Sequence, residues 1–86
     1  MKLEYDRAKD AANRLKHGVG LDLGGQVIEI AAHTLIDARM DYGEDRFVAF
    51  GYVEDRLYVC VFTMRSDATR IISVRKANER EVTQYG

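Results

Sequence analysis

The sequence lacks most of the features that assign a chain to a specialised class. Its 86 residues include one cysteine, Cys60, and neither proline nor tryptophan. Because Cys60 lies in an apolar run without a partner, the chain is not a disulfide scaffold, and a reducing compartment is expected. No apolar run approaches the ~20 residues that span a bilayer, so no membrane association is expected.

Signals for targeting, metal binding and nucleotide binding are also missing. Met1 is followed by Lys-Leu-Glu-Tyr-Asp, which is not a signal peptide, so a cytoplasmic location is expected. His17 and His33 have no cysteine or carboxylate at ligand spacing, so we expect no metal site and no cofactor. No low-complexity stretch or internal repeat is present either.

The composition is that of a small globular domain. Charged residues make up 31% and hydrophobic residues 47% of the chain, which excludes a disordered protein. The length predicts a single domain over residues 1–86. A domain of this size buries only about 60% of its unfolded surface, so its expected stability is modest.

The charge is unevenly distributed, although the net charge is only −1. Residues 1–17 hold five basic and three acidic groups, residues 65–81 hold the same numbers, and residues 22–45 hold six acidic groups. If the two basic segments meet in space, they form a positive surface that the net charge conceals. The alternative is that the charges intermix and cancel.

Periodicity predicts an α+β domain in which N-terminal helices precede an antiparallel meander. We expect strands at residues 2–5, 35–39, 46–53, 57–64 and 70–74, a second helix within 21–32, a turn at 41–44 and a short helix at 78–85. Gly24 and Gly25 weaken the start of the second helix by about 1 kcal/mol each relative to alanine.

The first helix has clear boundaries. Asp6 is expected to be its N-cap and Gly18 its C′ residue. The small apolar residues of this segment fall on one face at the helical period: Ala8, Ala11, Ala12 and Leu15.

Strand alternation sorts the side chains of the C-terminal half. Both faces of residues 57–64 are apolar in the middle, so this strand is expected to be central and covered on both sides. In the next strand, alternation places Arg70, Ile72 and Val74 on one face. It places Ile71, Ser73 and Arg75 on the other.

Arginine at the ends of these strands suits phosphate chemistry. Arg65 and Arg70 flank a turn, and Arg75 lies near the opposite end. A guanidinium group clamps phosphate through two hydrogen bonds and stays charged at physiological pH. It also stabilises the pentavalent transition state of RNA cleavage. The alternative is that Arg65 and Arg70 solvate the turn.

Three further residues are candidates for proton transfer or base contact, each with a plainer alternative. His17 is a general base or acid, or it caps the C-terminus of the first helix. Glu44 acts with Arg46 in the reaction, or the two form an ion pair at the start of a strand. Tyr85 stacks on a base, or it covers the edge of the sheet.

Several of these segments, in this order, resemble the BrnT family of small ribonuclease toxins from type II toxin–antitoxin systems. The matching blocks extend over almost the whole chain. They are Tyr5-Asp-Arg-Ala-Lys9, Asn13-Arg-Leu-Lys-His-Gly-Val19, Gly43-Glu-Asp-Arg46, Val61-Phe-Thr-Met-Arg65 and Arg70-Ile-Ile-Ser-Val-Arg-Lys-Ala77, with Glu81 and Tyr85.

The resemblance implies a RelE-like fold, with N-terminal helices packed on a twisted antiparallel sheet and a short C-terminal helix. It implies RNA cleavage without metal, growth arrest, and neutralisation by a BrnA-type ribbon-helix-helix antitoxin that binds promoter DNA. The implied catalytic residues are Arg46, Arg65, Arg75, Tyr85, His17 and Glu44. The implied RNA-binding residues are Arg70, Lys76 and Lys16.

The chain departs from the family pattern at three positions. Arg7 stands where the family usually has proline, and Gly24 and Gly25 replace a Glu/Ala-rich helix. With the net charge of −1, these departures motivate an alternative, a non-catalytic module that only binds the antitoxin. A third hypothesis is direct DNA binding by the basic ends, which predicts a salt-dependent complex without any antitoxin.

Overall fold

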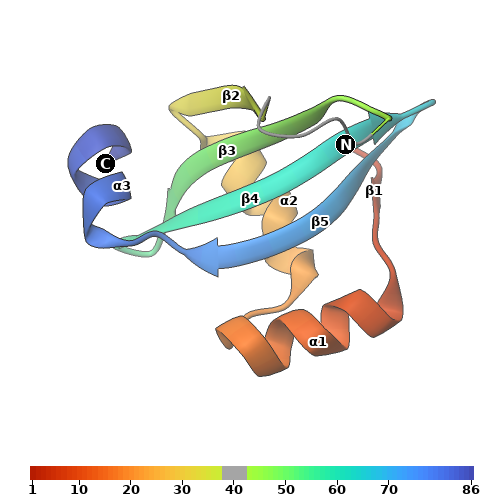
Figure 1. The fold of residues 1–86 in the computed structure, drawn as a ribbon, viewed down its shortest axis with the longest axis horizontal. Coiled ribbons are helices and arrows are strands. Elements are labelled where there is room, and N and C mark those ends of the chain that lie inside the picture. The colour runs from red at the N-terminus through yellow and green to blue at the C-terminus, as the bar shows by residue number, and fades with distance from the viewer. Residues whose placement is uncertain (38–42) are drawn as a thin grey trace.

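A computed structural model of the chain describes residues 1–37 and 43–86, and it confirms the α+β class (Figure 1). In chain order the elements are β1 (Leu3–Glu4), α1 (Arg7–His17), a 3₁₀ turn η1 (Leu21–Leu23), α2 (Gly24–Ile30), β2 (His33–Asp37), β3 (Arg46–Val53), β4 (Arg56–Arg65), β5 (Ala68–Lys76) and α3 (Glu79–Tyr85). Parts of the predicted strand at 35–39 and turn at 41–44 lie outside the described residues. Within them, no helix is long and apolar enough to cross a membrane.

The strands form one mixed sheet in the order β1-β5-β4-β3-β2. The meander from β2 to β5 is antiparallel, as predicted, and β4 is the central strand. The expectation of a wholly antiparallel sheet is wrong at β1, which pairs with β5 in parallel. No hairpin joins β1 to β5, so hairpin geometry does not set the direction of this pair.

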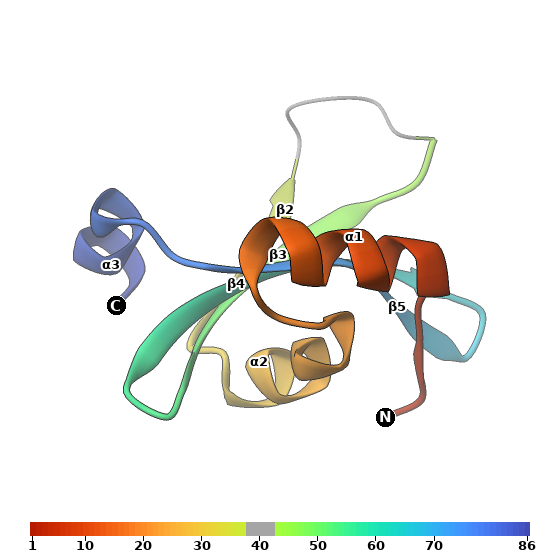
Figure 2. The same ribbon diagram turned by 90° about the horizontal axis from the view of Figure 1, so that it is seen from below.

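Helix α2 covers one face of the sheet, while none of the described helices crosses the opposite face (Figures 1 and 2). The prediction of a second helix is confirmed, and its two glycines have a packing role. A Cβ on Gly24 would lie 2.9 Å from Ile71 Cγ2 and 3.1 Å from Cys60 Sγ, and one on Gly25 would lie 2.7 Å from a methyl of Leu3. Glycine lowers the helix propensity at these positions, but the absence of a Cβ lets α2 approach the sheet closely.

Cys60 belongs to the core between α2 and the sheet, together with Leu21, Val27, Ile71 and other buried side chains. It is a free, buried cysteine. Burial raises the pKa of its thiol to about 12, so this side chain is an uncharged part of the core.

A β-bulge interrupts β5. Ser73 pairs with Val61 and Ile71 pairs with Phe62, so Ile72 is an extra residue. The prediction that Arg70 and Arg75 lie on opposite faces is therefore wrong, because an extra residue reverses the alternation beyond it. Arg70, opposite Thr63, and Arg75, opposite Val59, share the face that α2 leaves uncovered.

Helix α1 begins and ends as predicted, but it packs through a polar side chain. The Asp6 carboxylate accepts hydrogen bonds from the N–H groups of Ala8 and Lys9, and Gly18 ends the helix with φ of 77°. The buried residue is Asn13, whose Nδ2 donates to the carbonyls of Val19 and Val74, both at 2.8 Å. Its Oδ1 accepts from the Val74 N–H at 3.3 Å. Asn13 thus takes the place of a neighbouring strand at the edge of β5.

The apolar face of α1 consequently points away from the sheet. Ala8, Ala11 and Ala12 are exposed, and Leu15 is 91% exposed. This arrangement is the reverse of an ordinary amphipathic surface helix, which turns its apolar side to the core.

We expect Asn13→Ala to lower the free energy of unfolding by about 2–4 kcal/mol, because it leaves buried backbone groups of Val74 and Val19 without partners. Leu15→Ala, on the exposed face of the same helix, is the matched control and should change it by less than about 0.5 kcal/mol. Urea unfolding followed by circular dichroism measures both values. Equal midpoints for the two variants would contradict the role given to Asn13.

Candidate functional site

The face of the sheet opposite α2 carries most of the predicted site residues. We call it the open face. Strand register places on it Arg46, Val48 and Phe50 of β3, Val59, Val61 and Thr63 of β4, and Arg70, Ser73 and Arg75 of β5. The face therefore has an apolar middle with arginines toward both ends. Phe50, Val59 and Thr63 are buried in this middle, whereas Val48 and Val61 are partly exposed.

Glu44 organises one end of the open face. Its carboxylate lies between two predicted arginines, with Oε1 3.4 Å from Arg65 Nη2 and Oε2 4.0 Å from Arg46 Nε. The hydroxyl of Thr63 donates to the Asp45 carbonyl at 2.7 Å, which fixes the start of β3 against the end of β4. We call Glu44, Arg46 and Arg65 the Glu44 cluster.

Arg70 lies at the same end, where β1 meets β5. Its Nη1 is 3.7 Å from a carboxylate oxygen of Glu4, the residue opposite it in the parallel pair. The side chain of Arg70 is 24% exposed. It is therefore a partly screened cation rather than a fully solvated turn residue.

The other end of the open face is built around Arg75 and Glu81. Arg75 donates to both carboxylate oxygens of Glu81, at 2.7 and 2.8 Å. Glu81 also accepts from the Asn78 N–H and closes the capping box at the start of α3. These hydrogen bonds, with that from Arg75 the strongest, hold the pKa of Glu81 below its ordinary value. One carboxylate thus holds both Arg75 and the start of α3.

Glu81 was not among the predicted site residues, although the sequence contains a signal for it. Asn78 followed three residues later by Glu81 is the pattern of a capping box, which marks the start of a helix. The bidentate contact with Arg75 has no such signal, because it depends on where α3 docks.

Tyr85 covers part of the open face over strand β3 rather than an edge of the sheet, and stacking on a base stays a prediction. Its ring stacks on Phe50 with centroids 4.1 Å apart, and His33 lies at 5.6 Å in a tilted arrangement. Between α3, β2 and the sheet is a groove of about 350 Å³, with Val48, Val59, Val61, Arg75 and Tyr85 among its lining residues. Such an apolar groove with few charged groups is typical of a ligand site.

His17 lies in the last turn of α1, which packs against β5. Partial burial, followed by the positive charges of Lys16 and Arg75, lowers the pKa of His17 below its ordinary value of 6.5. The imidazole is therefore neutral at pH 7 and able to accept a proton. Lys16 is exposed beside it.

Lys76 does not lie on the open face. It pairs with Tyr58, and alternation places it on the other face of the sheet from Arg75. Of the two predicted RNA-binding lysines, Lys16 lies beside His17 and its positive charge helps to lower the pKa of that imidazole.

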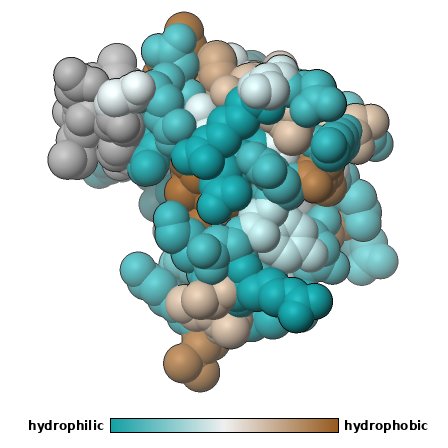
Figure 3. All heavy atoms as spheres, turned by 90° about the vertical axis from the view of Figure 1, so that its right-hand side faces the viewer, coloured by the Kyte–Doolittle hydropathy of each residue, from teal (hydrophilic) through white to brown (hydrophobic). Residues whose placement is uncertain are grey.

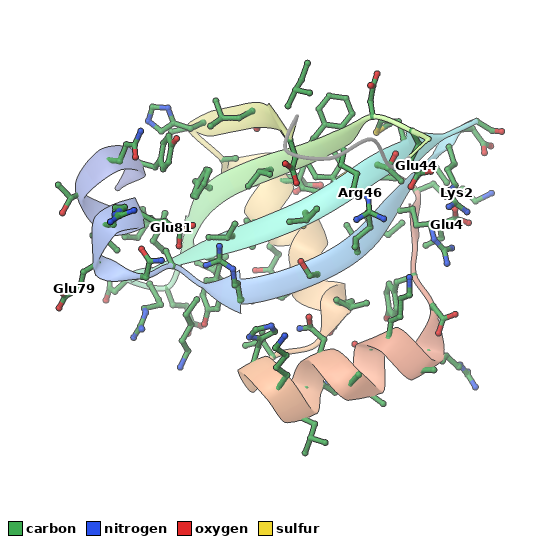
Figure 4. All side chains as sticks on the ribbon, viewed as in Figure 1. Lys2, Glu4, Glu44, Arg46, Glu79 and Glu81 are labelled. Carbon is green, nitrogen blue, oxygen red and sulfur yellow. The ribbon has the colours of Figure 1, made fainter. Side chains whose placement is uncertain are left out.

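The predicted site residues thus form two groups. Figure 4 shows Glu44 and Arg46 toward the end of the sheet occupied by Lys2 and Glu4, whereas Glu81 lies at the opposite end beside α3. The two basic segments of the sequence do meet, because β1 and α1 both contact β5. Carboxylates also lie beside the cations. The basic segments therefore come together, as one alternative predicted, and their charges are partly cancelled, as the other predicted. Among the residues described, no three histidine, cysteine or acidic side chains gather as metal ligands.

Fold and site define a small α+β domain with a cation-bearing sheet face that no described helix crosses. The family model described as "Ribonuclease toxin, BrnT, of type II toxin-antitoxin system" matches residues 5–81. The chain therefore belongs to the BrnT family and is a toxin of the type II class, which implies an antitoxin protein as partner. No curated protein matches the chain.

We expect Glu81→Gln to loosen α3, because neutral glutamine forms a weaker contact with Arg75 than a carboxylate does. A loss of about 1 kcal/mol, discounted for partial exposure, should speed amide hydrogen exchange in α3 about fivefold. Glu79→Gln, two residues earlier in the same helix, is the control. Unchanged exchange in Glu81→Gln would contradict the proposed anchoring.

The same contact should depend on pH. The pKa of Glu81 is lowered in the folded chain. Its contribution to the free energy of unfolding is therefore fully present above the pKa of the unfolded chain, about 4.5, and declines as the pH falls below that value.

Proposed function

We propose that this chain is an endoribonuclease toxin that cleaves RNA in the cytoplasm and arrests growth, with a RelE-like fold and side-chain catalysis that needs no metal. A BrnA-type ribbon-helix-helix antitoxin neutralises it and carries it to promoter DNA. The family match supports the activity class. The observation that carries the proposal is the bulge in β5, which brings Arg70 and Arg75 onto the same open face as Arg46.

RNA binds across this face in the proposal. Arg46, Arg65 and Arg70 hold phosphates at one end, and Arg75 holds the phosphate at the other. The apolar middle of the face offers Val48 and Val61 as surfaces for bases or riboses. Arginine is suited to this task because its planar guanidinium group donates two parallel hydrogen bonds to phosphate.

Cleavage proceeds by attack of a ribose 2′-oxygen on the adjacent phosphorus. A general base takes the proton of the 2′-OH, the new O–P bond forms, and the bond from phosphorus to the 5′-oxygen breaks. The products are a 2′,3′-cyclic phosphate and a 5′-hydroxyl group, which receives its proton from a general acid. Arg75 stabilises the additional negative charge on phosphorus in the transition state.

We assign the general base to His17. The lowered pKa keeps the imidazole neutral at pH 7, and the cation that contributes to the shift, Arg75, is the proposed phosphate ligand. Glu44 is the alternative at the other end of the face. Tyr85 is the candidate for the general acid that gives a proton to the 5′-oxygen.

The competing proposal is a non-catalytic chain that only binds the antitoxin. One observation favours it, because each open-face arginine has a carboxylate within 4.0 Å: Glu44 for Arg46, Glu4 for Arg70 and Glu81 for Arg75. These carboxylates reduce the attraction of the face for RNA.

We expect Arg46→Gln combined with Arg75→Gln to reduce RNA cleavage by the purified chain about 100-fold or more, because both ends of the phosphate site lose a charged donor. Arg56→Gln is the matched control. It removes one arginine charge from the face on which alternation places Tyr58 and Cys60, and should leave the rate unchanged. The assay measures cleavage of a labelled RNA with EDTA present, together with growth after induced expression. Absence of cleavage by the unaltered chain would favour the non-catalytic alternative.

The pH dependence tests the assignment of His17. A base must be deprotonated to act, so kcat/KM should rise with pH along a limb whose midpoint lies below the ordinary histidine pKa of 6.5, because the pKa of His17 is lowered. Lys16→Ala removes a positive charge beside the imidazole, which raises its pKa and should move this limb toward higher pH. A limb that stays in place in Lys16→Ala and persists in His17→Gln would assign the base to another residue.

A further inference from the structure

The reversed orientation of α1 leaves an apolar stripe on the surface. Ala8, Ala11, Ala12 and Leu15 fall on one side of the helix, and the side of Asn13 faces the sheet. In Figure 3 the lowest part of the molecule, which is α1, carries brown and tan apolar spheres between teal polar ones. Leu15, at 91%, is the most exposed of the large hydrophobic side chains in the described residues.

The stripe is shaped for another helix. Alanines at successive turns allow a close backbone approach, and Leu15 supplies one large side chain that can enter a groove on the partner. Helical geometry holds these residues in one row, because positions three and four apart are neighbours on the surface.

Cations border the stripe on both sides. At 100° per residue, Arg7 lies on one side of the row, while Lys9 and Lys16 lie on the other. All three are exposed. A partner helix with acidic residues beside its apolar positions would complement this rim.

A second copy of the chain fits the stripe poorly. Two α1 helices packed through their stripes would bring like charges of Arg7 and Lys9 together. One leucine and a few alanines also provide far less than the roughly 800 Å² per partner of a stable interface. The stripe therefore suits one helix of a larger, chemically different partner.

We propose that the outer face of α1 is a docking surface for an acidic amphipathic helix of the antitoxin. This inference depends on the proposed antitoxin partner but not on RNA cleavage. Since α1 contacts the sheet through the side of Asn13, a helix bound to its outer face leaves the open face uncovered. Docking on α1 thus supplies affinity, and any block of the open face comes from another part of the antitoxin.

The test uses the purified chain and its proposed ribbon-helix-helix antitoxin, with the dissociation constant measured by calorimetry. Leu15→Glu should raise this constant about 30-fold or more, since it removes an apolar contact and places a carboxylate against acidic residues. The RNA cleavage rate and circular dichroism spectrum of the free variant should not change. Ile30→Glu, at the end of α2 and 61% exposed, is the control and should bind normally.

The charged rim is tested by Arg7→Glu combined with Lys9→Glu. This variant should weaken binding about tenfold at low salt and much less at high salt, because added ions screen exposed charges.

Three results would overturn the docking surface: normal antitoxin binding by Leu15→Glu, loss of binding in Ile30→Glu alone, or a dimer of the free chain that Leu15→Glu dissociates. If the unaltered chain cleaves RNA while Leu15→Glu binds antitoxin normally, the docking proposal fails and the enzyme proposal stands. If binding depends on Leu15 but no RNA is cleaved, docking stands and catalysis fails.

Discussion

The β-bulge at Ile72 is the constraint on which the other features depend. Two residues three positions apart, Ile71 and Val74, both enter the core beneath α2, which strict alternation would forbid. The extra residue makes this compatible with Arg70 and Arg75 facing the other way. It also sets the orientation of Val74, whose backbone N–H and carbonyl bind Asn13. The packing of the core, the residues of the open face and the attachment of α1 therefore all depend on this bulge.

The attachment of α1 solves a problem of the edge strand. β1 protects only the first part of β5, and unpaired backbone groups further along would offer a template to other chains. The side chain of Asn13 satisfies these groups at Val74, because a carboxamide presents a donor and an acceptor as a backbone peptide does. A helix held in this way must turn its polar side inward, and its apolar side is left for a partner.

Local rules predicted the parts of the fold that local forces decide. The caps Asp6 and Gly18, the class of the fold and the central position of β4 follow from side-chain chemistry and alternation over a few residues. The bulge and the buried Asn13 do not, since periodicity counts apolar positions and assumes regular strands. Gly24 and Gly25 weakened the prediction of the second helix, because helix propensity is a local property. Their advantage is close packing on Ile71 and Leu3, which are far away in the sequence. At the site, the residue types were enough to predict that arginines bind phosphate. The shared face of Arg70 and Arg75 could not be predicted, because it depends on the bulge.

Pairing every open-face arginine with a carboxylate has a consequence for function. Phosphate must compete with Glu44, Glu4 or Glu81 for the same guanidinium donors, which lowers affinity and favours ligands with more than one negative charge. At Arg75 the competition extends further, because Glu81 also caps α3. In the proposed complex, a phosphate that takes Arg75 from Glu81 weakens one of the contacts that hold α3 over the groove, while the Tyr85–Phe50 stack remains. RNA binding and the position of α3 are therefore linked through a single carboxylate.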